Sequence, residues 1–124
     1  MNTKKKRSIM IVDDEPDIVL VLAEYLEGEG FSVLTAKSGE QAIAKAREHP
    51  IDLSIVDISM PVISGIETLT QMKKSKPHLP VIMITAFRDA EKVLEAFRQG
   101  ANDCIFKPLD FDYLMSSIIS SLSK

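Results

Sequence analysis

The chain alternates between short, nearly continuous apolar runs and longer stretches in which apolar residues recur at helical spacing. The runs predict five β-strands, at residues 9–12, 33–34, 53–56, 81–84 and 104–106. The first, third and fourth runs are nearly all apolar instead of alternating, which is typical of parallel strands covered on both faces. The pattern therefore predicts a parallel sheet buried between layers of helices.

Helical periodicity fills the gaps between these strands and the stretch after the last one. The predicted helices carry their apolar stripes at residues 18–26, 42–46, 66–72, 90–97 and 111–122. Proline, glycine and capping side chains stand where these helices would begin or end. These residues are Pro16, Gly28, Gly30, Ser38, Pro50, Pro77, Gly100 and Asp110.

Five consecutive strand–helix units predict an α/β fold with a doubly wound, five-stranded parallel sheet. A chain of 124 residues has room for one ordinary domain. We expect residues 8–122 to form this domain and residues 1–7, which include the basic run 4–7, to form a flexible tail.

Composition and charge narrow the expected partners. A net charge of −3 and a pI near 5.4 argue against nucleic acid as the main partner. The apolar run 9–12 is too short for a secretion signal or a membrane span, and the single Cys104 cannot form an internal disulfide. We therefore expect a cytoplasmic protein that binds neither nucleic acid nor a membrane through this domain.

Polar residues leave four of the five predicted strands at the carboxyl edge of the sheet, where open α/β sheets bind ligands. Asp13 and Asp14 follow the first strand, Asp57 the third, Thr85 the fourth and Lys107 the fifth. Each has an ordinary structural explanation by itself, such as a helix cap, a loop acid or a solvated lysine. Together these explanations would require four coincidences at one edge, so the pattern favours a functional site.

The charges of these residues indicate the chemistry of the site. Carboxylates about 4 Å apart repel one another by about 4 kcal/mol at an effective dielectric near 20, so the cluster must take up protons or a cation. All-oxygen ligands suit Mg²⁺. With Lys107 and the Thr85 hydroxyl beside a nucleophilic carboxylate, the set is typical of phosphoryl transfer. No glycine-rich loop follows the first strand, which disfavours a dinucleotide or P-loop site.

The motifs IVDDEPD, SIVDISMPVISG, MITA and GANDCIFKP, in this order and spacing, resemble the receiver domain of two-component response regulators. The resemblance runs from about Ser8 to Leu122. It implies a flavodoxin-like, chemotaxis-regulator-like sheet in the order 2-1-3-4-5, with two helices on one face and three on the other. It also implies a signalling switch whose only catalysis is its own phosphotransfer and dephosphorylation.

The resemblance assigns a role to each residue at the carboxyl edge. Asp57 would accept a phosphoryl group from a phosphohistidine on a sensor histidine kinase or phosphotransfer protein. The expected Mg²⁺ ligands are Asp14, Asp57 and the Ser59 backbone carbonyl, with Asp13 acting through water. Lys107 and Thr85 would hold the phosphoryl oxygens, and the Lys107–Pro108 peptide bond would be cis.

One position departs from the family pattern. Receivers usually have an aromatic residue three positions before the lysine, which turns inward behind the threonine on activation; here the residue is Cys104. We interpret the Cys104 thiol as a small buried hydrophobic group in preference to a redox sensor. In a regular strand, Phe106 would face the same side as Cys104. The resemblance also implies that phosphorylation changes the surface formed by the fourth helix, fifth strand and fifth helix, and that this surface controls a partner or effector domain.

Two residues near the site suggest tuning of the reaction. Phe87, two positions after Thr85, would hinder water from reaching the phosphoryl group and lengthen the phosphorylated state. Leu20 falls outside the apolar stripe of the first helix and reads as an ordinary exposed leucine, with partner docking as the alternative.

Two other functions remain open at this stage. A Mg²⁺-dependent phosphatase of the haloacid dehalogenase type needs two acids separated by one residue after the first strand, whereas Asp13 and Asp14 are adjacent. A docking module that keeps the fold without being phosphorylated is disfavoured by the intact acid, threonine and lysine set, but Cys104 keeps it in view.

Overall fold

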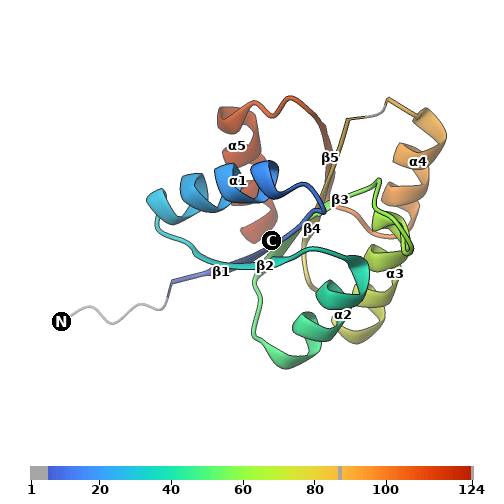
Figure 1. Cartoon of the computed structure of the whole chain (residues 1–124), viewed down its shortest axis with the longest axis horizontal. Helices are drawn as coiled ribbons and strands as arrows, with labels where there is room; N and C mark the ends of the chain where they lie inside the picture. The colour runs from blue at the N-terminus through green and yellow to red at the C-terminus, as the bar shows by residue number, and fades with distance from the viewer. Residues whose placement is uncertain (1–5, 87, 124) are drawn as a thin grey trace.

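The computed structural model describes residues 6–86 and 88–123, in which strands and helices alternate along the chain (Figure 1). All five predicted strands and all five predicted helices are present. The strands are β1 (Ser8–Val12), β2 (Ser32–Ala36), β3 (Leu53–Asp57), β4 (Val81–Thr85) and β5 (Asp103–Phe106). The helices are α1 (Pro16–Gly28), α2 (Gly39–Glu48), α3 (Gly65–Ser75), α4 (Ala90–Arg98) and α5 (Phe111–Leu122).

The strands form one parallel sheet in the order β2-β1-β3-β4-β5, as the family resemblance implied. The chain winds outward from β1 to β2 and then returns past β1 to β3. The direction of winding therefore reverses between β1 and β3, and the crevice at their carboxyl ends is the place where sheets of this kind bind ligands.

Two helices cover one face of the sheet and three cover the other (Figure 1). Alternate residues of the same strand serve the two cores: Ile9 and Ile11 pack with α1 and α5, whereas Met10 and Val12 pack with α2, α3 and α4. Because both faces are buried, the strands need apolar residues at nearly every position, which is the pattern seen in the sequence.

Each of the five strands extends at least one residue beyond the apolar run that predicted it, and the extensions of β2, β3 and β4 bear on the site. Pairing with β1 extends β2 to Ser32 and Ala36, beyond the predicted 33–34. Asp57 pairs with Ile84, and Thr85 pairs with Phe106, so these two polar residues end their strands instead of beginning loops. The difference arises because sheet hydrogen bonds depend on the backbone and continue past the last apolar side chain.

The helix ends follow the capping residues seen in the sequence. The Ser38 side chain accepts a hydrogen bond at the start of α2, and Asp110 accepts two at the start of α5. Gly100 follows α4 with a φ of 104°, a left-handed conformation that favours glycine. Within the described part of the chain, no helix has the length and apolar character needed to cross a membrane.

Candidate functional site

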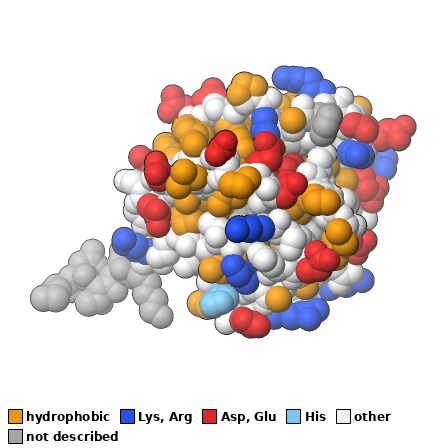
Figure 2. Space-filling view, in the orientation of Figure 1, with side chains coloured by type: hydrophobic (Ala, Val, Ile, Leu, Met, Phe, Trp, Pro, Cys, Tyr) orange, Lys and Arg blue, Asp and Glu red, His pale blue; other side chains and the backbone are white. Residues whose placement is uncertain are grey.

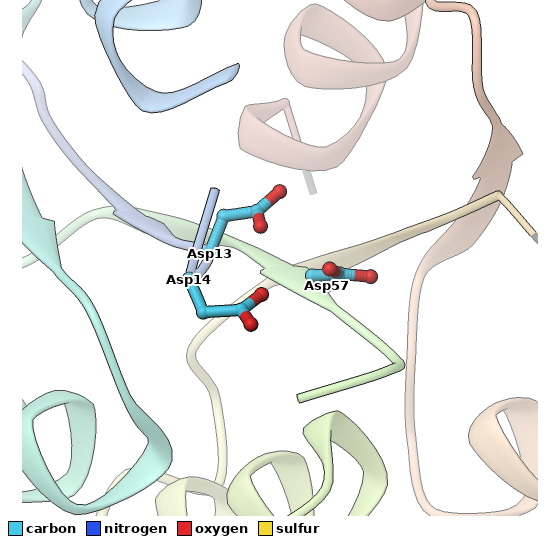
Figure 3. A group of neighbouring side chains, drawn as sticks. All are labelled: Asp13, Asp14 and Asp57. Carbon is cyan, nitrogen blue, oxygen red and sulfur yellow. The ribbon is translucent and has the colours of Figure 1, made fainter. Parts of the chain in front are cut away.

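Three carboxylates meet at the carboxyl ends of β1 and β3 (Figure 3). Asp13 and Asp14 directly follow β1, and Asp57 is the last residue of β3. One oxygen of each side chain lies within 4.8 Å of the other two. Asp13 and Asp57 are buried and Asp14 is exposed. The predicted convergence of the three acids is confirmed, and the resulting set of oxygen atoms fits a hard divalent cation such as Mg²⁺.

The acid pair after β1 does not cap α1. The N-cap residue of α1 is Glu15, and no side-chain oxygen caps the helix there. Asp13 instead accepts the backbone N–H of Glu15 through Oδ1, at 3.0 Å, and Lys107 Nζ through Oδ2, at 3.1 Å. Both oxygens of Asp13 are therefore engaged by the protein, whereas Asp14 presents its carboxylate at the surface.

Lys107 is the positive charge of the site. Its Nζ lies 3.1 Å from Asp13, 2.9 Å from Glu15 and 3.5 Å from Asp57, and its side chain is 10% exposed. Burial by itself lowers the lysine pKa, but hydrogen bonds to Glu15 and Asp13 outweigh this effect and raise it. Lys107 therefore stays protonated among the acids. The Lys107–Pro108 peptide bond is cis, as the resemblance implied.

The surroundings of the Asp57 carboxyl raise its pKa. Burial and the neighbouring charge of Asp13 raise its pKa, while the Lys107 charge and the Ser59 N–H oppose them, and the pKa reaches about 6. Burial is the largest of these effects because the 3% exposed carboxylate has lost most of its water. A carboxylate that is costly to keep ionised is stabilised by a cation bound beside it.

The loop after β3 returns to Asp57 at both ends. The Ser59 N–H donates to Asp57 Oδ1 at 3.2 Å, and the Gly65 N–H donates to the Ile58 carbonyl at 2.8 Å. A Cβ on Gly65 would overlap the backbone carbonyl oxygen of Asp57. Only glycine lets α3 begin so close to the end of β3, which explains the glycine of the SIVDISMPVISG motif.

Thr85 and Phe106 lie side by side at the ends of β4 and β5. They are register partners in the parallel sheet. Met83 and Cys104, two residues earlier in each strand, pack against the core under α2, α3 and α4, so Thr85 and Phe106 face the same side. The Arg88 guanidinium carbon lies 4.5 Å from the centre of the Phe106 ring, within cation–π range.

Cys104 occupies the position where the family usually has an aromatic residue, but it pairs with Met83 and not with Thr85. It is partly buried against the core. Burial and the charge of Asp103 raise the thiol pKa, so the reactive thiolate is scarce at neutral pH. These observations favour the interpretation of Cys104 as a small hydrophobe.

Two contacts of the site were not anticipated from the sequence. Glu15 directly follows the two aspartates and was assigned no role, yet it makes the shorter of the two hydrogen bonds to Lys107. Arg88, in the connection between β4 and α4, carried no sequence signal, because its partner Phe106 lies on β5, far away in the sequence. Phe87, the expected shield of the phosphoryl group, lies outside the described residues.

The comparison with known proteins agrees with the fold and the site geometry. The family model described as "Response regulator receiver domain" matches residues 9–119. The chain belongs to this family. The chain is therefore a receiver domain, a class of phosphorylation-dependent signalling switches that typically bind Mg²⁺ in an acidic pocket.

Relatives of known sequence are longer than this receiver domain. The transcriptional regulatory protein ZraR of Salmonella typhimurium is 38% identical over 118 residues, which are 95% of this chain and 27% of ZraR. The response regulator GtcR of Aneurinibacillus migulanus is 40% identical over 105 residues, 84% of this chain and 43% of GtcR. The chain thus spans about a quarter to less than half of these relatives.

Solved structures agree with the fold in detail. A CheY-like receiver domain protein from Methanospirillum hungatei JF-1 superposes with a TM-score of 0.93 at 29% identity, covering 96% of this chain and 95% of that one. A receiver domain from Clostridium thermocellum gives 0.90 at 32% identity, covering 94% of each chain. Response regulators of this kind are phosphorylated by histidine kinases and act on effectors.

Proposed function

We propose that Asp57 accepts a phosphoryl group from a phosphohistidine and that the domain catalyses this transfer itself. The observation that carries the proposal is the position of Asp57, buried at the end of β3 with Asp13, Asp14 and Lys107 around its carboxylate. An Asp57 oxygen would attack phosphorus, form an acyl phosphate and break the P–N bond. The bonding electrons pass to the histidine nitrogen, and the ring leaves as neutral imidazole when its other nitrogen carries a proton.

The acidic groups are proposed to hold Mg²⁺. Asp14, Asp57 and the Ser59 backbone carbonyl would be direct ligands, while Asp13 would act through water because Lys107 and the Glu15 N–H already occupy its two oxygens. When bound, the ion supplies positive charge that offsets the charge developing on the phosphoryl oxygens. Lys107 would add a second positive charge, and Thr85 would donate its hydroxyl to a phosphoryl oxygen.

The switch is proposed to run from Thr85 to the surface of α4, β5 and α5. Thr85 would move toward the phosphoryl group, while Pro108 fixes the backbone after the lysine. Cys104 cannot turn a ring inward in the way an aromatic residue does. Phe106, beside Thr85 and under Arg88, is the group that can transmit the change on this face. Its movement would alter the start of α4, which an effector or partner protein would read.

The wider setting of the reaction is also proposed. Residues 8–122 would be the receiver domain, whereas residues 1–5 of the expected tail 1–7 lie outside the described residues. A sensor kinase draws its phosphoryl group from ATP, which favours a cytoplasmic location. No binding to nucleic acid or membrane through this domain is expected, in keeping with the acidic pI and with the acidic and basic side chains interspersed over the face shown in Figure 2. Leu20 is exposed on α1, as expected, and its docking role stays a hypothesis that Leu20→Ser would test.

One experiment tests the reaction. The wild type and Asp57→Asn are incubated with Mg²⁺ and acetyl phosphate and analysed by intact-mass spectrometry, with Asp52→Asn as a control acid outside the site. We expect one added phosphoryl group on wild type and Asp52→Asn, none on Asp57→Asn, and loss of labelling in EDTA. Turnover of acetyl phosphate without an adduct would indicate a phosphatase, and no reaction would indicate a docking module.

A further inference from the structure

Val62, in the loop between β3 and α3, has a backbone conformation that valine strongly avoids. Its φ is 68°, and it is the one non-glycine residue with a positive φ in the part of the chain that the structure describes. The left-handed region brings Cβ close to the backbone, and branching at Cβ makes the clash worse. Backbone strain of this kind tends to occur at functional sites.

The Val62 side chain gains almost nothing inside the domain that could offset this strain. It is 90% exposed, the largest exposure among the large hydrophobic residues described. Glycine would adopt the same φ without a clash, and asparagine would adopt it at lower cost. The isolated domain would therefore be more stable with either residue, whereas a contact with another molecule would give the exposed valine a use that the domain alone does not provide.

The geometry of the loop keeps Val62 close to the acceptor. A Cβ on Gly65 would overlap the Asp57 carbonyl oxygen, so the Gly65 Cα is itself in contact with Asp57. Val62 is three residues from Gly65, and three steps of about 3.8 Å limit its Cα to about 11 Å from that point. Val62 therefore lies within about 15 Å of Asp57.

A protein that donates a phosphoryl group to Asp57 contacts the domain over a surface that extends this far. A standard interface buries about 800 Å² on each partner, equivalent to a circle of about 16 Å radius. A donor that brings its phosphohistidine to Asp57 centres its surface on the mouth of the crevice, so the rim of the crevice falls under that surface. An exposed apolar side chain on this rim is suited to contact the donor, whereas a small phosphate donor reaches Asp57 without touching it.

We propose that Val62 is a docking residue for the protein that donates the phosphoryl group, and that it packs against an apolar patch beside the donor's phosphohistidine. The inference rests on the proposed phosphorylation of Asp57 and deepens it by naming a specificity residue outside the reacting groups. Valine is kept at this position, at the expense of domain stability, because its apolar surface contributes binding energy only in the complex.

The test separates domain stability, chemistry and docking. Val62→Gly and Val62→Asn are compared with wild type and with Ile119→Gln. Ile119 is 56% exposed and lies near the end of α5. The Leu122 carbonyl at this end accepts a hydrogen bond from Arg7, which directly precedes β1, so this end of α5 lies at the amino edge of the sheet, opposite to the site. The small donor is acetyl phosphate. The protein donor is the fastest of a panel of purified, autophosphorylated sensor-kinase transmitters with the wild type.

Three results are expected together. Both Val62 variants raise Tm by roughly 2–5 °C because the strain is relieved. Their labelling by acetyl phosphate stays within about twofold of wild type, since the reacting groups are untouched, but transfer from the kinase slows about fivefold or more. Ile119→Gln leaves both rates unchanged.

Other outcomes would overturn the proposal in distinguishable ways. Wild-type rates of kinase transfer in both Val62 variants would exclude Val62 from docking. A panel in which no transmitter phosphorylates the wild type, although acetyl phosphate does, would rule out the protein donor on which docking depends. Failure of acetyl phosphate to label wild-type Asp57 would instead overturn the proposed function itself.

Discussion

The Lys107 ammonium nitrogen lies 3.5 Å from Oδ2 of Asp57, while the same nitrogen hydrogen-bonds to Asp13 at 3.1 Å and Glu15 at 2.9 Å. Lys107 is thus held beside Asp57 by the two other acids that it contacts. It neutralises Asp57 at short range without a strong hydrogen bond to it. A phosphoryl oxygen on Asp57 would have a protonated amine within reach.

Replacing Lys107 by an apolar side chain of similar length tests this arrangement. In Lys107→Met the acids lose their positive partner, so the Asp57 pKa should rise further and labelling by acetyl phosphate should slow by about 10-fold or more. Initial rates measured from pH 5 to 8 would show both effects. Lys74→Met, which changes an exposed lysine of α3, should behave as wild type; equal rates in both variants would mean that Lys107 is not needed for the reaction.

The raised pKa of Asp57 predicts a dependence of stability on pH. Between about pH 4 and pH 6 the folded carboxyl keeps a proton that the unfolded one has released, so the free energy of unfolding falls as pH rises through this window. A shift from 3.8 to about 6 corresponds to a loss of up to about 3 kcal/mol above pH 6.

Asp57→Asn removes this titration. In EDTA it should be more stable than wild type at pH 7.5, and the difference should shrink toward zero at pH 4, as measured by urea unfolding at both values. Mg²⁺ should reduce the difference at pH 7.5 by stabilising the wild-type carboxylate. A difference independent of pH would show that Asp57 does not titrate in this range.

Gly65 and Gly28 form a matched pair for testing the approach of α3 to Asp57. A Cβ at Gly65 would overlap the Asp57 carbonyl oxygen, whereas a Cβ at Gly28 has no heavy atom within 4 Å. Gly65→Ala should therefore lower the free energy of unfolding by about 3 kcal/mol or more and reduce phosphorylation. Gly28→Ala should be neutral or stabilising by up to about 1 kcal/mol. Similar stabilities for the two variants would refute the close approach.

The Arg88–Phe106 contact predicts a measurable coupling. A double-mutant cycle with Arg88→Gln and Phe106→Leu should give about 0.5–1 kcal/mol in urea unfolding of the unphosphorylated domain. If Phe106 transmits the change at Thr85, Phe106→Leu should also weaken the change in hydrogen exchange at α4 on phosphorylation, with labelling of Asp57 intact. Cys104→Ala serves as the control, since Cys104 pairs with Met83 and not with Thr85. If only this variant lost the change in hydrogen exchange at α4, Cys104 and not Phe106 would transmit the change at Thr85.

Much of the fold and site could be predicted because the signals are local in the sequence. Apolar runs indicate buried parallel strands whatever their neighbours, and the residue that leaves a strand is known once the strand is located. Asp13, Asp14 and Asp57 could therefore be assigned to one edge of the sheet, which the structure confirms. Strand ends were predicted less well, since β3 and β4 extend through Asp57 and Thr85 by backbone pairing.

The amino-acid sequence by itself determined the alternation of strands and helices, the acidic crevice and the family. Only the tertiary structure decided which side chains meet across strands: that Glu15 shares Lys107 with Asp13, that Phe106 and not Cys104 stands beside Thr85, and that Arg88 covers its ring. These contacts depend on register and on side-chain direction between segments far apart in the chain. The strain at Val62 belongs to the same class, because a φ of 68° is a property of the folded loop.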